Sequence, residues 1–135
     1  MGNEQDIQKN LQILEYYKEQ LANVDMQMQY TQAALADIYK AKLTIKELKD
    51  ADGDAEVMFP LGGGTFVKGT VVGPGKVLVD IGRGVVVEKP SNDALEKLQE
   101  RIKELEETVN RLSQMDQKIR EDAEKLSEET QKMMQ

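Results

Sequence analysis

The chain has 135 residues, a net charge of −7, 32% charged residues and only 4% aromatic residues, so we do not expect a large globular core. It contains no Cys and no His, which excludes disulfides, thiolate and imidazole catalysis and the usual zinc sites, and which fits a reducing cytoplasm. The acidic balance argues against a nucleic-acid-binding protein, and we expect neither a membrane span nor a signal segment.

A long N-terminal helix is predicted for residues 4–50. Its apolar residues recur in a heptad with Ile7, Leu14, Leu21, Met28 and Leu35 at a, and Tyr17, Val24, Thr31, Ile38 and Ile45 at d. A register sustained over about five heptads favours a coiled coil over an isolated amphipathic helix. The pattern loosens at Lys42, where we expect a stutter or a change of partner.

An acidic turn follows this helix. Asp50, Asp52 and Asp54 have the spacing of the first three ligands of an EF-hand calcium loop. Gly53 does not stand at the sixth position, however, and Leu61 occupies the twelfth, which requires Glu. We interpret the segment as a solvated turn, and predict no metal site.

Residues 56–89 are predicted to form two consecutive β-hairpins. Short runs of β-branched and aromatic residues alternate there with glycine-containing turns at 62–64, 73–75 and 82–84. Two hairpins cannot bury this much apolar surface alone, and their open edges favour pairing with other chains. The sequence therefore predicts that strands from several subunits complete a β-barrel.

The glycine runs of this region also invite comparison with a phosphate-binding loop. Such a loop opens a helix, so that backbone N–H groups face the phosphates. Here residues 62–64 lead into a β-run, and Lys68-Gly69-Thr70 lies inside a predicted strand. These glycines are better explained as turn residues with positive φ, and no nucleotide or other cofactor is expected.

A second long helix is predicted for residues 91–133. Its heptad places Leu95, Ile102, Val109, Asp116, Ala123 and Thr130 at a, and Leu98, Leu105, Leu112, Ile119, Leu126 and Met133 at d. Folding this helix back on the first brings Ile45 near Leu95 and Ile7 near Met133. The predicted fold class is therefore α+β: a long antiparallel two-helix coiled coil with two β-hairpins at its base that join a multi-subunit β-barrel.

The far end of this coiled coil combines polar seam positions with apolar side chains. Asn10 and Asp116 weaken the seam, while methionines at the end of the chain can fill irregular gaps at small cost. Two interpretations stay open, an adaptable surface for other proteins or an ordinary seam with a frayed end. The residues concerned, named here the tip residues, are Ile7, Leu11, Leu14, Leu126, Met133 and Met134.

The order helix, PLGGGTFVKGTVVGPGKVLVDIGRGVVVEK, helix resembles the α-type subunits of archaeal prefoldin, with its specific part between Phe59 and Lys89. The resemblance implies a single prefoldin-like domain over residues 1–135, in a hexamer of two α-type and four β-type subunits joined by a double β-barrel. It also implies that non-native clients are held at the arm tips without ATP and passed to a group II chaperonin. The barrel residues that it implies are Val57, Phe59, Leu61, Phe66, Val67, Val71, Val77, Val79, Ile81, Val85 and Val87.

Other functions remain to be weighed against this one. A structural coiled-coil scaffold would need no client surface, and an α-like paralogue could assemble into filaments instead of hexamers. An enzyme is not expected, because the acidic residues lie on solvated helix faces and form no polar cluster in a cleft.

Overall fold

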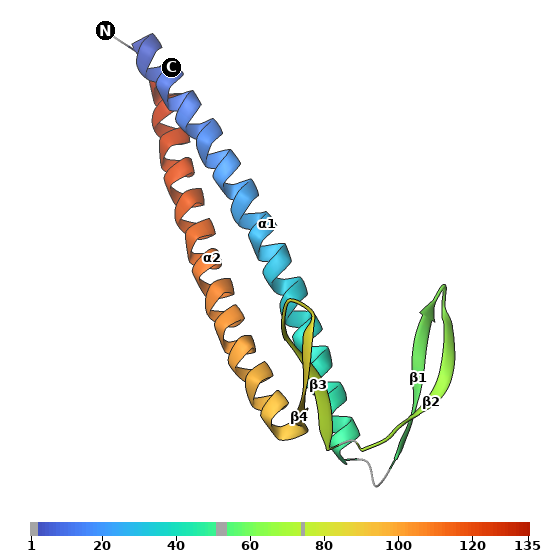
Figure 1. Cartoon of the computed structure of the whole chain (residues 1–135). Coiled ribbons are helices and arrows are strands. Elements are labelled where there is room, and N and C mark those ends of the chain that lie inside the picture. Colours follow the sequence, from blue (N-terminus) through green and yellow to red (C-terminus); the bar gives the residue numbers. More distant parts are fainter. Residues whose placement is uncertain (1–2, 51–53, 74) are drawn as a thin grey trace. The chain divides into compact units, whose positions relative to one another are not determined.

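The computed structural model describes residues 3–50, 54–73 and 75–135. It consists of helix α1 (Asn3–Asp50), strands β1 (Ala55–Gly62), β2 (Thr65–Val71), β3 (Lys76–Gly82) and β4 (Val85–Pro90), and helix α2 (Ser91–Met134) (Figure 1). The predicted fold class of two long helices with two antiparallel hairpins is confirmed for the chain itself. Asp52 and Gly53 of the acidic turn lie outside the described residues.

The chain divides into two compact units, which we describe separately. The arm unit contains the described residues up to Leu35 together with Glu104–Gln135, and the hairpin unit is Ala36–Lys103. Both helices are continuous and contain neither Gly nor Pro, the residues that most weaken a helix interior. Their predicted a and d positions are all buried or half-buried, as a two-helix seam requires.

The antiparallel pairing of the helices is visible in polar contacts across the seam. In the arm unit, Nδ2 of Asn10 donates to Sδ of Met133 at 3.7 Å, one turn from the expected pair of Ile7 with Met133. In the hairpin unit, Nζ of Lys42 donates to Oε1 of Gln99, and Nζ of Lys49 donates to Oδ1 of Asn92. Lys42, at which the apolar stripe is interrupted, therefore forms a polar contact with the facing helix.

The two hairpins are separate two-stranded sheets, β1 with β2 and β3 with β4. Each turns through two residues with positive φ, Gly63 and Gly64 (58° and 78°) in the first and Arg83 and Gly84 (52° and 75°) in the second. Such pairs suit the tight hairpin turns whose twist matches that of the strands. The predicted positive φ at these glycines is confirmed, and Lys68-Gly69-Thr70 lies within β2.

Residues that pair across a hairpin share a face of the sheet. In the first hairpin, Ala55 pairs with Val71, Val57 with Gly69 and Phe59 with Val67, which defines face A. The opposite face carries the pairs of Glu56 with Thr70, Met58 with Lys68 and Pro60 with Phe66. Face A is thus apolar throughout, whereas the opposite face is mixed.

Gly69 lies under the Phe59 ring on face A. A Cβ at Gly69 would lie 2.4 Å from Cε2 of Phe59. We expect Gly69→Val to destabilise the hairpin by about 1–3 kcal/mol through this overlap. The higher strand propensity of Val offsets at most about 1 kcal/mol of this loss. Backbone amides of β1 and β2 should therefore exchange with deuterium several-fold faster in the variant.

A matched control is Gly75→Ala, because a Cβ at Gly75 would meet nothing within 4 Å. Amide exchange in β1 and β2 should be unchanged in this control. Equal exchange in the Gly69→Val variant and the wild type would show that the contact with Phe59 does not constrain the hairpin.

Candidate interaction surfaces

Polar chemistry is sparse in the part of the chain that the structure describes. Within residues 3–50, 54–73 and 75–135, no group of three or more acidic side chains is placed to hold a metal ion. No helix among these residues combines the length and apolar character needed to cross a membrane. The features that stand out are apolar surfaces, which include the following four places.

The first place is the pair of hairpins. Nine large apolar side chains of their strands are extensively exposed, from 45% for Phe59 to 73% for Leu78. A two-stranded hairpin is at best marginally stable in water unless a further layer covers its apolar face. Of the predicted barrel residues, Leu61, Phe59, Phe66, Val67, Ile81 and Val85 are exposed, while Val57, Val71, Val77, Val79 and Val87 are half-buried.

The pairing register separates these barrel residues into groups that the sequence alone did not distinguish. Val57, Phe59, Val67 and Val71 lie on face A, whereas Phe66 pairs with Pro60 on the opposite face. In the second hairpin Val79 pairs with Val87 and Val77 with Lys89, so these three valines share one face. Leu61 and Ile81 occupy irregular positions where each register shifts, next to the turns.

The second place is a groove within the hairpin unit. It has a volume of about 610 Å³ and lies between β3 and the adjoining parts of α1 and α2. Its apolar lining is Ile38, Ala41, Ile45, Val77, Leu78, Val79, Ala94 and Leu98, and its polar lining is Asp80, Lys97 and Arg101. Val77 and Val79, both predicted barrel residues, thus face a space that the single chain leaves open.

The third place is the end of the arm unit, where the tip residues lie. Leu11 and Met134 are 47% and 64% exposed, and both stand outside the a and d positions. The other four, Ile7, Leu14, Leu126 and Met133, are half-buried in the seam. The structure therefore divides the tip residues into two surface side chains and four that pack between the helices.

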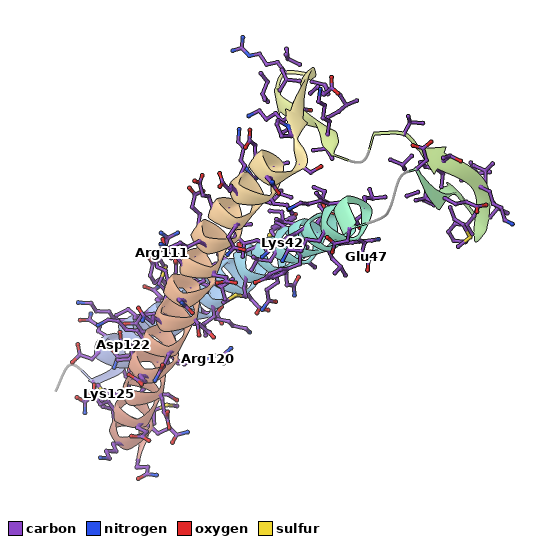
Figure 2. The ribbon with its side chains drawn as sticks, turned by 90° about the horizontal axis from the view of Figure 1, so that it is seen from below. Lys42, Glu47, Arg111, Arg120, Asp122 and Lys125 are labelled. Carbon is purple, nitrogen blue, oxygen red and sulfur yellow. The ribbon has the colours of Figure 1, made fainter. Side chains whose placement is uncertain are left out.

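The fourth place was not identified from the sequence. Tyr16, Met26 and Tyr30 on α1 are exposed by 57%, 56% and 73%, and Met115 on α2 by 43%. The signal that could have revealed them is simple, since large apolar residues outside a and d cannot reach the seam. Charged side chains such as Arg111, Arg120 and Lys125 are also exposed on α2 (Figure 2).

Comparison with known proteins gives a consistent result. The family model described as "Prefoldin subunit" matches residues 17–135. "Prefoldin subunit alpha" of Methanococcoides burtonii is 35% identical over 82 residues, which are 61% of this chain and 59% of the relative. The chain thus spans about three fifths of the length of that curated relative.

Two solved structures share the fold. A chain of the filamentous PFD from Methanocaldococcus jannaschii has a TM-score of 0.69 at 24% identity, with 85% of this chain and 95% of that chain covered. The prefoldin beta subunit from Thermococcus strain KS-1 has a TM-score of 0.63 at 25% identity, with 94% of this chain and 90% of that chain covered.

Proposed function

Because the chain belongs to the prefoldin family, we propose that it is an α-type subunit of an ATP-independent molecular chaperone that captures non-native proteins and delivers them to a group II chaperonin. The observation that carries this proposal is the family match over residues 17–135. In this role the chain acts as a single prefoldin-like domain in the cytoplasm, needs no cofactor and catalyses no reaction.

We propose that its partners are β-type prefoldin subunits, and that two α-type chains assemble with four β-type chains. Exposed apolar side chains on both hairpins support this assembly, because a monomer would leave them in water. Strands of neighbouring subunits would cover face A and close the open edges into a barrel. A partner strand could also fill part of the groove beside Val77 and Val79.

The mechanism that we propose is passive and multivalent. A fully buried apolar side chain contributes about 1.5–3 kcal/mol, and one partly covered at the end of an arm contributes less, so one arm holds a client weakly. Several arms on one base raise the effective concentration of each further contact and convert weak contacts into useful avidity. Single contacts still break quickly, which allows transfer without nucleotide hydrolysis.

The test of this function combines assembly with activity. Native mass spectrometry of the chain mixed with a β-type prefoldin subunit should give a hexamer with two copies of this chain. The hexamer should suppress aggregation of a chemically unfolded model protein without ATP, and the isolated chain should do so less well. Equal protection by the isolated chain would contradict the multivalent mechanism.

The double variant Leu11→Ser with Met134→Ser should weaken client binding at the tip. Both side chains are exposed, so the helix pairing should persist in the variant. Each partly covered contact with the client is worth about 1 kcal/mol, and its loss should lower the client affinity about fivefold. Client affinity can be measured by fluorescence anisotropy with a labelled unfolded protein. Leu43→Ser, at a leucine 59% exposed in the hairpin unit, is the control and should leave affinity unchanged.

A second candidate is a structural assembly without clients, either a scaffold or a filament. The specific observation in its favour is the shared fold with a chain of a filamentous PFD. In that case the chain alone should form long homo-oligomers that ignore the β-type subunit. Replacing the tip residues would then leave its function intact, unlike in the chaperone.

A further inference from the structure

An apolar patch lies on α1 away from the seam. Met26 and Tyr30, one helical turn apart, line a shallow depression together with Gln29 and are 56% and 73% exposed. The neighbouring seam positions are Val24, which is buried, and Met28, which is half-buried. Met26 and Tyr30 therefore contribute nothing to the helix pairing, and we name them, with Gln29, the shaft patch.

Few charges stand near the shaft patch on its own helix. Between Glu19 and Asp37, Asp25 is the one charged residue of α1. The exposed positions of this stretch carry Gln, Asn and Ala beside Met26 and Tyr30. Apolar groups of another chain can therefore approach here without stripping water from several charges, which would be costly.

The charge of the chain is divided unequally between the two units. Residues 1–35 and 104–135 contain 14 acidic and 7 basic residues, a net charge of −7. Residues 36–103 contain 11 acidic and 11 basic residues, so their net charge is zero. The whole net charge thus belongs to the arm unit, which carries the shaft patch, and at low salt a partner of positive charge is attracted to this unit.

We propose that the shaft patch is a second client-binding surface, which takes non-native segments that carry apolar or aromatic side chains beside Lys or Arg; this rests on the proposed chaperone function. Met26 adapts to irregular apolar side chains, because its thioether chain is flexible and polarizable. The exposed ring of Tyr30 offers a face to a Lys or Arg side chain.

Charge also decides against a second copy of this chain as the occupant. Pairing two shaft patches would bring together two arm units that each carry a net charge of −7. Such self-association is opposed by repulsion at low salt, whereas a basic segment is favoured under the same conditions. The surface therefore selects basic, apolar segments over acidic ones.

The test uses the full-length chain and two labelled synthetic peptides with the same apolar centre, one flanked by Lys and the other by Glu. Fluorescence anisotropy at low salt should show at least about fivefold tighter binding of the Lys-flanked peptide. About 0.5 M NaCl should remove most of this difference, because it shortens the screening length severalfold.

The variant Met26→Gln with Tyr30→Gln should weaken binding of the Lys-flanked peptide about fivefold or more. Gln keeps the helix propensity, and an unchanged thermal unfolding curve will confirm that the arm is intact. The matched control is Leu43→Gln, at a leucine 59% exposed in the hairpin unit, which should leave the affinity for both peptides unchanged.

Each outcome decides the proposal. Equal wild-type affinity for the two peptides, or a double variant that binds the Lys-flanked peptide like the wild type, would overturn it. If either result were found while the assembled complex still suppressed client aggregation, the proposed chaperone function would stand. Failure of the assembled wild type to suppress aggregation would instead contradict the chaperone function.

Discussion

Replacing Ile102 by Ala is expected to lower the free energy of unfolding by about 2–5 kcal/mol. Ile102 is 1% exposed at an a position of α2, and the substitution removes its buried branched side chain. Both the lost burial and the cavity left behind contribute to the cost. The effect can be measured by chemical denaturation followed by circular dichroism of the helices.

The expected effect is large because the core is thin. Among the described residues, the buried apolar side chains are Val24, Ala94, Ile102 and Leu112. Few layers of side chains can relax into a cavity when two helices share one seam, so the cavity should persist. Total stability is of the order of 5–15 kcal/mol for ordinary domains, and the loss would be a large part of it.

The control for this experiment is Lys103→Ala, at the next residue, whose side chain is exposed. It should change the free energy of unfolding by no more than about 0.5 kcal/mol. Chain concentration must be the same for all variants, because association stabilises the folded form by mass action. If the two substitutions had equal effects, the seam at Ile102 would not limit stability.

The helix pairing could be predicted from the sequence because a coiled coil is close to one-dimensional. Once the a and d positions and the turn at the hairpins are known, the length of each helix decides which residues meet. This reasoning predicts that Ile7 lies near Met133. In the structure Asn10, one helical turn from Ile7, contacts Met133. The hairpins were predictable for a similar reason, since glycine turns mark where each strand ends.

The exposure of individual apolar residues, and the hairpin face on which each lies, could not be predicted to the same extent. Phe66 and Val67 are neighbours in one apolar run, and only the register with Pro60 and Phe59 shows that they lie on opposite faces. Likewise, Leu11 and Met134 look like seam residues by composition, yet their positions outside a and d leave them exposed. Exposure depends on the position within a repeat, which hydrophobicity alone does not give.

A charge on face A should abolish association with β-type subunits. In Phe59→Asp, a carboxylate replaces a ring on the apolar face formed with Val57, Val67 and Val71. If this face is buried in the barrel, the charge would be desolvated without a partner, which costs several kcal/mol per subunit. Native mass spectrometry with a β-type subunit should then show the separate chains in place of a hexamer.

Phe66→Asp is the matched variant, with the same chemical change on the opposite face. Phe66 pairs with Pro60, and that face already carries Glu56, Lys68 and Thr70, so a carboxylate there can stay in water. The Phe66→Asp variant should therefore assemble much as the wild type does. The reverse result, with Phe66→Asp preventing assembly and Phe59→Asp permitting it, would place the subunit interface on the mixed face, and loss of assembly in both variants would mean that both faces are covered.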